Sequence, residues 1–424
     1  MNLIHEITMR SYALIKRNPR LKAFVLPLYR VASALAARAR FFAVRKSPGA
    51  DMTITVCKSV AAWVTSSGGQ GNWCKEIHPA VTVQRPVPKT IGPVHWKFME
   101  RQSEVLPSTF VACLHDARIW EDCKVITTDN QLLTEVSKEI VRGEYHELPM
   151  GHALYTGKIL LPLEKLKGRT AVLSAPSGRG YYHWMFDVLP RLDLIRRAGV
   201  DWSNVDCFLV NDYITRFHIE TLHQLGLVKR KIRSSHWHPY LKAEELIVPS
   251  LVGNTGHIPR WTCDFLRNSF LRQRPGKINN INHTTRALRL YLSRGQVAHR
   301  RVVNEQEVID LLHRFGFRNI LLESLSFAEQ VAMLNSASVV VAPHGAGLTN
   351  IVFCNPGTRV IEILSPRAVN IMYWTLCSQI DLDYYYLLAE GAVPADREDR
   401  YENSEDLKID IRALAGLLEI SGIH

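Results

Sequence analysis

The sequence predicts an α/β protein whose C-terminal half forms a parallel, doubly wound sheet. From residue 170 onward, short apolar runs typical of strands alternate with stretches of helical periodicity. Hydrophobic residues make up 46% of the 424 residues and charged residues 22%. This composition excludes disordered and fibrous proteins, and the length allows two to three domains at about 150 residues each.

A basic segment opens the chain. Residues 1–46 contain ten Lys and Arg residues and one acid, Glu6, so they carry +9 of the formal net charge of +12. The remaining residues therefore carry only +3, which argues against a nucleic-acid groove on the folded body. The apolar runs around Arg30 are too short to span a membrane, and the start lacks the compact pattern of a cleavable signal.

We expect residues 1–46 to form a basic amphipathic helical segment. At 100° per residue one stripe of apolar side chains results, consisting of Phe24, Leu28, Val31, Leu35 and Phe42. Such a helix either docks on the body of the protein or lies on an anionic membrane surface, and the charge favours the membrane. The expected location is the cytoplasm, with peripheral association at the inner face of the membrane.

The sequence divides into four segments, which we expect to be the basic segment 1–46, an N-terminal α/β domain 47–272, a C-terminal Rossmann-like domain 287–395 and a C-terminal helix 396–424. Residues 47–150 alternate short β-branched runs with turn residues, which predicts mixed, strand-rich structure. Residues 272–286 collect Pro, Gly and Asn without apolar periodicity, which predicts a linker. The tail has one helical stripe that we expect to pack back on the body, at Leu407, Ile411, Leu414 and Leu418.

Individual elements follow from the same patterns. In the N-terminal domain we expect strands at 171–174, 207–210 and 245–249, and helices at 182–197 and up to about 225. In the C-terminal domain we expect strands at 288–293, 319–322, 339–342, 360–364 and 384–388. Helices are expected after Asn304, at 327–335, from Gly345 and at 372–378.

The most specific motif follows the strand at 339–342. His344 leads into Gly345-Ala346-Gly347, with Asn350 three residues later. Glycine removes side chains where a helix begins, so backbone N–H groups can approach a diphosphate closely. Glu362, on the next strand, is expected near the sheet edge, where an acid can accept hydrogen bonds from ribose hydroxyls. The alternative for the glycines is tight packing of helix on strand.

Two other motifs carry candidate site residues. His183 and Asp187 are spaced i, i+4 within Tyr181-Tyr-His-Trp-Met-Phe-Asp187, so on a helix the carboxylate could orient the imidazole of a general base. A structural pair at the surface is the alternative. Arg294 ends Tyr291-Leu-Ser-Arg294 and could bind a diphosphate at the same sheet edge as Gly345.

Metal and disulfide sites are not expected. The eight cysteines include no C-x-x-C pair, which indicates reduced, mostly buried thiols. His236 and His238 lack further ligands at metal-binding spacing. Asp381-Leu-Asp383 matches the D-x-D motif of metal-dependent transferases, but it follows an expected helix and precedes a strand, which favours a solvated helix end.

These three motifs, in this order, resemble glycosyltransferase family 61, which includes bacterial capsule-type enzymes and eukaryotic enzymes that modify glycoproteins or plant xylan. The resemblance covers roughly residues 105–390 and leaves residues 1–46 outside. Its first part is Tyr182-His183-Trp184 with Asp187 and Leu189-Pro190-Arg191. The second is Tyr291-Leu-Ser-Arg294 with Arg301, Asn304 and Glu305, and the third is His344-Gly-Ala-Gly347 with Asn350, Pro356-Gly357 and Glu362.

The resemblance implies a GT-B fold, in which two Rossmann-like domains face a cleft, and an inverting, metal-independent transfer. A sugar would pass from a nucleotide-sugar donor to a hydroxyl of a glycan or lipid-linked acceptor, in capsular or other surface polysaccharide biosynthesis. His183 would be the base and Asp187 would orient it, with the reverse assignment open. The expected donor-binding residues are Arg294, Arg301, His344, Gly345, Ala346, Gly347, Asn350 and Glu362.

Two alternatives to an active transferase remain. The first is a nucleotide-sugar or glycan binding protein without turnover. The second is a dinucleotide-dependent enzyme, since Gly345 and Gly347 match the start of G-x-G-x-x-G, although Asn350 stands where the third glycine belongs. No cofactor or metal is expected besides the nucleotide-sugar co-substrate.

Overall fold

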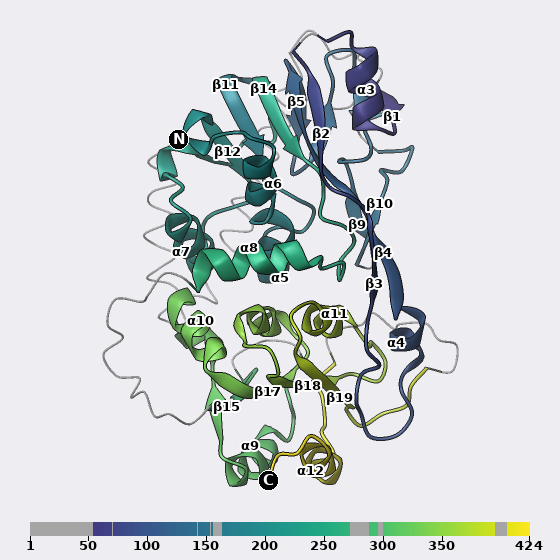
Figure 1. Cartoon of the computed structure of the whole chain (residues 1–424), viewed down its shortest axis with the longest axis vertical. Helices are drawn as coiled ribbons and strands as arrows, with labels where there is room; N and C mark the ends of the chain where they lie inside the picture. The colour runs from purple at the N-terminus through teal and green to yellow at the C-terminus, as the bar shows by residue number, and fades with distance from the viewer. Residues whose placement is uncertain are drawn as a thin grey trace.

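The chain forms two lobes, which are seen one above the other in a computed structural model (Figure 1). The structure describes residues 54–69, 71–141, 143–152, 154–155, 163–271, 288–295, 300–394 and 405–424. The basic amphipathic helix expected in residues 1–46 and the linker expected at 272–286 lie outside these residues. No helix within the described ranges is long and apolar enough to cross a bilayer.

A mixed ten-stranded sheet forms the centre of the first lobe. Its strands run in the order β1-β8-β7-β6-β14-β11-β12-β13, and β5 pairs with both β14 and β2. Only β14, β11, β12 and β13 form a continuous parallel part. The sheet consists of β1 (Thr55–Cys57), β2 (Trp73–His78), β5 (Thr109–His115), β6 (Arg118–Trp120), β7 (Lys124–Ile126), β8 (Gln131–Leu133), β11 (Glu164–Val172), β12 (Cys207–Val210), β13 (Ile232–Ser234) and β14 (Tyr240–Pro249).

The expected strand-rich character of residues 47–150 is confirmed for the described part, while the expected helix at 182–197 is interrupted. It consists of α5 (Tyr181–His183), a π-helical turn η2 (Trp184–Val188) and α6 (Arg191–Arg197). Pro190 lacks a backbone N–H, and Leu189 donates to the carbonyl of Trp184 five residues back, so the helix widens before it restarts. The lobe also contains α3 (Val60–Ser66), η3 (Trp202–Asn204), α7 (Arg216–Gln224), η4 (Lys229–Lys231), α8 (Arg260–Phe270) and the hairpin β9 (Glu139–Val141) with β10 (Glu144–His146).

The second lobe has the parallel, doubly wound sheet that the sequence predicts. Five parallel strands run in the order β16-β15-β17-β18-β19, so the strand order reverses between β15 and β17. Ligands in such sheets bind at the carboxyl ends of the strands beside this reversal. The strands are β15 (Leu288–Leu292), β16 (Phe317–Ile320), β17 (Ala337–Pro343), β18 (Arg359–Leu364) and β19 (Asp383–Leu388).

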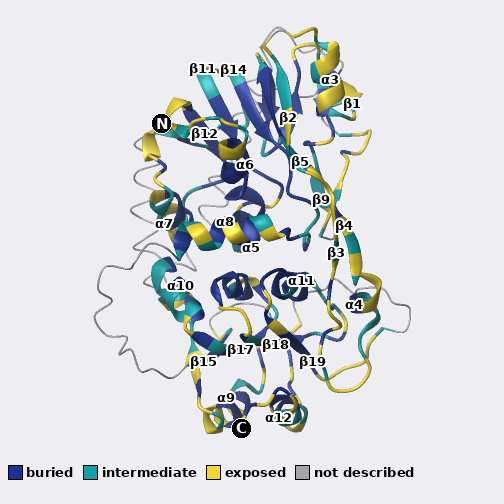
Figure 2. Cartoon of the chain, viewed as in Figure 1, coloured by how far each residue is buried: buried dark blue, intermediate teal, exposed yellow. Residues whose placement is uncertain are grey.

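Helices cover both faces of this sheet, which explains the continuous apolar strands. Val339 and Val341 belong to one buried cluster with α9 (Glu305–Arg314) and α12 (Ile411–Ile420), whereas Val340 and Ala342 belong to another with α10 (Phe327–Asn335). η6 (Ala346–Phe353) and α11 (Met372–Gln379) lie on the side of α10, and η5 (Leu322–Ser324) precedes α10. Figure 2 shows central strands such as β12 and β17 as largely buried, whereas β2, β3 (Val81–Gln84) and β4 (Ser103–Leu106) are more exposed. The tail packs against the cluster of α9, as predicted, but its helix is shorter than expected, because α12 begins at Ile411 and Leu407 lies before it in a bridge to Val302.

An arm from the first lobe extends over the second (Figure 1). The arm, residues 81–106, consists of β3 (Val81–Gln84), α4 (Trp96–Glu100) and β4 (Ser103–Leu106), with β3 and β4 antiparallel. Phe98 is fully buried with its ring centroid 4.6 Å from that of Tyr386 and 5.3 Å from that of Trp374. Residues 86–98 therefore pack with the second lobe. The expected domain boundary at 272–287 instead assigns them to the N-terminal domain.

Candidate functional site

The site of the second lobe is built where its strand order reverses. Arg294 follows β15, while His344 and Gly345 follow β17. A Cβ atom placed on Gly345 would lie 1.8 Å from Nη1 of Arg294, so the guanidinium occupies the space that a side chain at residue 345 would need. Gly345 has an extended backbone, with φ of 168°, so close approach and not backbone strain requires glycine here.

Glu305 fixes the end of β15. Its Oε1 accepts hydrogen bonds from the hydroxyls of Tyr291 at 3.1 Å and Ser293 at 2.8 Å, and from the backbone N–H of Arg294 at 3.4 Å. Three residues of the Tyr291-Leu-Ser-Arg294 motif thus bind one carboxylate at the start of α9. Partial burial and the charge of Arg300 lower the pKa of the Arg294 guanidinium, which still remains a cation at neutral pH.

A buried hydrogen-bonded group lies behind His344. Nδ1 of His344 is 2.5 Å from Oε1 of Glu362, and the Tyr384 hydroxyl donates to Oε2 of Glu362 at 2.6 Å. The Glu362 side chain has no exposed area, whereas 14% of the His344 side chain is exposed. A carboxylate at this distance fixes the orientation of the His344 ring.

This arrangement corrects the role expected of Glu362. Both of its oxygens are bound inside the protein and the side chain is wholly buried, so it cannot reach a ribose hydroxyl. It acts on the site only through His344. The prediction placed Glu362 on the correct strand. It failed because the sequence does not show that Tyr384, on the neighbouring strand β19, binds the Glu362 carboxylate.

Other expected donor-binding residues also differ in position. Arg301 forms an ion pair with Asp406 at 2.8 Å, with more than half of its side chain exposed, and so binds the C-terminal segment instead of joining Arg294. Asn350 is fully buried, and its amide nitrogen donates to Gln330 at 2.9 Å. Ala346 is exposed beside Gly345, and Gly347 packs against Leu322. The structure thus brings together Arg294, His344, Gly345, Ala346 and Gly347 as the surface of this site.

The site of the first lobe also lies at the carboxyl ends of parallel strands, after β11. Nδ1 of His183 is 2.6 Å from Oδ2 of Asp187, with 18% of the His183 side chain and 5% of the Asp187 side chain exposed. Burial raises the pKa of the Asp187 carboxyl, although the hydrogen bond to His183 opposes that shift. The expected i, i+4 pair is therefore present, with the imidazole outside and the carboxylate inside.

Neighbouring side chains fix the backbone around His183. The Tyr182 hydroxyl accepts the backbone N–H of Gly256 at 3.0 Å, and Nε1 of Trp184 donates to Thr221 at 2.9 Å. Arg191 is fully buried and donates to the carbonyls of Ser174 and Pro249. Since Ser174 follows β11 and Pro249 ends β14, Arg191 holds together the strand ends that carry the site.

The two sites meet between the lobes. The Tyr181 hydroxyl donates to Oδ1 of Asn350 at 2.5 Å, which joins the residues around His183 to the helix that follows Gly345. The Tyr373 ring, on α11, lies 6.2 Å from the Tyr182 ring and 5.4 Å from the His344 ring. One aromatic side chain therefore contacts both motifs.

Tyr373 and Gln330 are the residues that sequence reasoning missed. Tyr373 lies in an apolar helix whose pattern indicates only burial, and burial does raise the pKa of its hydroxyl. Gln330 is a polar residue of α10 and does not belong to its buried apolar residues, so the sequence alone indicates a surface position. No signal in a single sequence distinguishes either residue from others of its helix.

Within the described ranges, no group of three or more His, Cys, Asp or Glu side chains is arranged to hold a metal ion. Asp381 and Asp383 lie at the amino end of β19, at the edge opposite to Arg294 and Gly345. Both side chains are about half exposed or more, and they pair with Arg260 and Lys89. The D-x-D motif is thus a solvated turn, as expected from its position in the sequence.

Comparison with known proteins identifies a family over the part of the chain that carries these sites. The sequence model of Glycosyltransferase 61 matches residues 181–361, which include all three motifs except Glu362, the residue just after the matched range. The recognition of this family from the motifs is therefore confirmed over that range. The family consists of glycosyltransferases.

Named relatives support the same family. A β-1,2-xylosyltransferase of Arabidopsis thaliana is 38% identical over 78 residues, which are 15% of this chain and 15% of the relative. The β-1,2-xylosyltransferase RCN11 of Oryza sativa subsp. japonica is 32% identical over 105 residues, or 22% and 19% of the two chains. The human protein O-linked-mannose β-1,4-N-acetylglucosaminyltransferase 2 is 32% identical over 126 residues, or 27% and 21%. The matched segments thus span about a fifth or less of these relatives.

Replacing Gly345 with alanine tests the placement of Arg294. The new Cβ must displace the guanidinium, and loss of a charge-assisted hydrogen bond to phosphate should weaken nucleoside diphosphate binding about tenfold to a hundredfold. Isothermal titration with uridine and guanosine diphosphates measures this effect. Gly151→Ala is the matched control, because its Cβ would meet no atom within 4 Å. Equal affinity of Gly345→Ala and wild type would contradict the placement.

Proposed function

Because residues 181–361 match glycosyltransferase family 61, we propose that this protein is an inverting, metal-independent glycosyltransferase. It would move a sugar from a nucleotide-sugar donor to a hydroxyl of a glycan or lipid-linked acceptor in surface polysaccharide synthesis. The observation that supports the proposal is the 2.5 Å hydrogen bond between Tyr181 and Asn350, which joins the segment of His183 and Asp187 in the first lobe to the helix after Gly345 in the second. The two facing α/β lobes are in keeping with a GT-B arrangement.

His183 is proposed as the base. With Nδ1 donating its proton to Asp187, the neutral imidazole has an acceptor lone pair on Nε2, which can take the proton of an attacking acceptor hydroxyl. Asp187 stabilises the imidazolium that results. The reverse assignment is less favourable, because the Asp187 carboxylate is 5% exposed and already bound by His183.

The second lobe would stabilise the leaving group. As the bond from the anomeric carbon to the phosphate oxygen breaks, negative charge grows on the diphosphate. Arg294, His344 and the backbone N–H groups from Ala346 onward lie where strands β15 and β17 end. These fixed positive groups could supply the stabilisation that a divalent cation supplies elsewhere. Attack from the face opposite the diphosphate inverts the anomeric carbon.

A donor panel tests the proposed reaction. Wild-type protein should release nucleoside diphosphate from at least one nucleotide sugar in the presence of EDTA, and His183→Ala should lower kcat by about 10²–10⁴ while the donor still binds. Asp187→Asn should lower kcat as well. Since burial raises the pKa of Asp187, the wild-type rate should begin to fall with decreasing pH above the ordinary titration range of aspartate.

His223→Ala is the matched control, because His223 is an exposed histidine on α7 and its loss should leave kcat unchanged. If the protein binds nucleotide sugars but releases nucleoside diphosphate from none of them, the result would favour a binding protein without turnover. Activity that EDTA abolishes and manganese restores would overturn the metal-independent mechanism.

We also propose that residues 1–46 hold the enzyme at an anionic membrane surface on the cytoplasmic side. The support is the charge of that segment, +9 within 46 residues, together with the near-neutral remainder of the chain. If half of its basic residues contact anionic headgroups at about 1 kcal/mol each, reversible association results.

Flotation with liposomes tests the membrane proposal. The full chain should float with vesicles that contain phosphatidylglycerol, and it should leave them in high salt, because salt screens the attraction. A chain that begins at residue 47 should stay unbound. Equal flotation of the two chains would contradict the proposal.

A further inference from the structure

A second cavity lies between the arm and the two lobes, apart from Arg294 and His344. Its volume is about 860 Å³, within the usual range for ligand sites. The arm contributes Trp96 and Glu104, the loop after β14 contributes Gly256 and His257, and the loop before α11 contributes Asn370. With the β9–β10 hairpin, four parts of the chain that are far apart in sequence thus form one cavity. The proposed reaction, as argued so far, uses none of these five residues.

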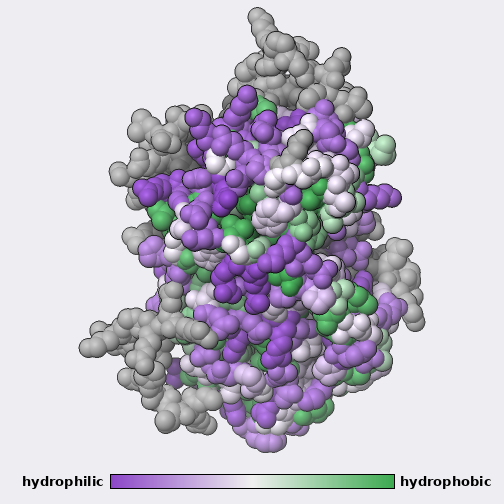
Figure 3. Space-filling view, turned by 45° about the horizontal axis from the view of Figure 1, so that its top comes forward, coloured by the Kyte–Doolittle hydropathy of each residue, from purple (hydrophilic) through white to green (hydrophobic). Residues whose placement is uncertain are grey.

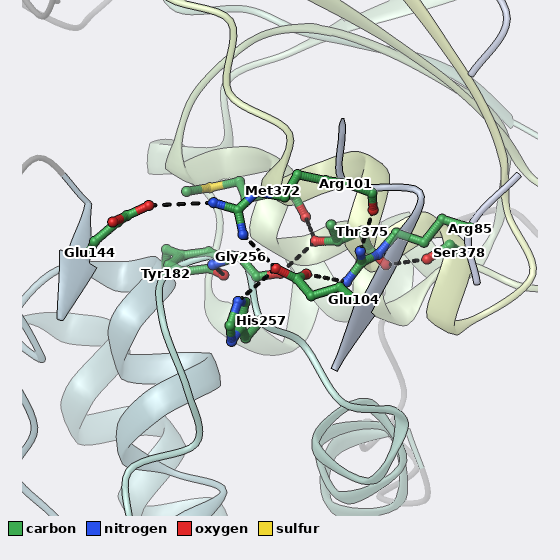
Figure 4. Close-up of polar contacts among 10 residues, drawn as sticks. All are labelled: Arg85, Arg101, Glu104, Glu144, Tyr182, Gly256, His257, Met372, Thr375 and Ser378. Carbon is green, nitrogen blue, oxygen red and sulfur yellow. Dashed lines mark hydrogen bonds and ion pairs between the residues drawn. The ribbon is translucent and has the colours of Figure 1, made fainter. Parts of the chain in front are cut away.

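Glu104 is the centre of the cavity wall (Figure 4). Its carboxylate accepts hydrogen bonds from Arg101 at 2.7 Å, Arg85 at 2.8 Å and Nε2 of His257 at 2.9 Å. Burial alone would raise the pKa of the Glu104 carboxyl, yet His257 and Arg85 lower it to about 2. Glu104 is therefore an anion at neutral pH, and it holds the arm against the loop at His257.

The same loop connects the cavity to the proposed base. The backbone N–H of Gly256 donates to the hydroxyl of Tyr182, the residue before His183, and the Gly256 carbonyl accepts from Thr375 on α11 at 2.8 Å. Figure 4 shows Tyr182, Gly256 and His257 side by side at the wall. A ligand in the cavity would thus lie next to the segment that carries His183.

The chemistry of the lining favours an uncharged, hydroxyl-rich ligand. The charged residues among the described lining residues are Lys97, Arg101, Glu100, Glu104 and Glu144, which sum to −1 with histidine neutral. Arg101 binds Glu104 and Glu144 (3.4 Å), so its charge is already balanced. The lining thus offers no surplus of positive charge to a diphosphate, whereas its carboxylates and the amides of Asn254 and Asn370 can bind sugar hydroxyls.

We propose that this cavity binds the saccharide of the acceptor as a neutral sugar, with Trp96 contacting the sugar ring. The proposal rests on the proposed function and adds the place and the chemical class of the acceptor. In this proposal the two substrates bind at different sites because they differ in charge. The anionic donor binds at Arg294, and the neutral acceptor binds between the arm and the loop at His257.

Ligand-observed NMR with methyl glycosides tests this proposal on the full chain. A panel of neutral methyl hexosides and pentosides at millimolar concentration is compared with the corresponding methyl uronides. At least one neutral glycoside should bind the wild type more tightly than its uronide. Trp96→Ala should weaken that binding about tenfold or more, whereas Met99→Ala, an exposed position on the same helix outside the cavity, should not.

A charge variant gives an independent readout. Glu144→Lys changes the sum of the lining charges from −1 to +1, so it should shift preference toward the uronide. Circular dichroism confirms that each variant is folded. Failure of every neutral glycoside to bind, equal binding by Trp96→Ala and wild type, or tighter wild-type binding of the uronide would each overturn the proposal. Failure of the wild type to bind any nucleotide sugar would instead contradict the proposed function.

Discussion

The hydrogen bond between Tyr181 and Asn350 is the contact on which the rest of the site depends. Each lobe has its functional residues at the carboxyl ends of parallel strands, and neither set forms a complete site alone. His183 and Asp187 could move a proton but could not stabilise a leaving diphosphate. Arg294 and Gly345 could bind a diphosphate but provide no base. Tyr181 is two residues from His183, and Asn350 is five residues from Gly345. The hydrogen bond between Tyr181 and Asn350 therefore sets the distance between the residues at His183 and those at Gly345.

Two buried carboxylates each hydrogen-bond a partly exposed histidine and fix the orientation of its ring. Asp187 lies beneath His183 and Glu362 beneath His344, at 2.6 Å and 2.5 Å. The two pairs have the same geometry but different neighbours. Glu362 accepts a second hydrogen bond from Tyr384, so both of its oxygens are bound inside the protein. Burial raises the pKa of Asp187, and in the proposed reaction it is the His183–Asp187 pair that gains and loses a proton. The face of the molecule seen in Figure 3 is mainly hydrophilic, with apolar residues in small groups.

The sequence predicted the second lobe well because its elements follow local rules. Apolar strands separated by helical stretches specify a parallel sheet, and α10 begins after Ser326, which forms a capping box with Glu329. The i, i+4 spacing of His183 and Asp187 was sufficient to predict their contact. The arm could not be predicted, since Phe98 and Tyr386 are distant in sequence. For the same reason the buried position of Glu362, the ion pair of Arg301 with Asp406 and the role of Tyr373 emerged only from the structure.

A double-mutant cycle on Tyr181 and Asn350 tests most directly whether the two lobes form one site. The measured quantity is kcat/KM for release of nucleoside diphosphate from the donor that the wild type uses, in wild type, Tyr181→Phe, Asn350→Ala and the double variant. If the contact sets the separation of base and diphosphate, the two effects should be coupled by about 1 kcal/mol or more. Additive effects, within about 0.5 kcal/mol, would contradict the account.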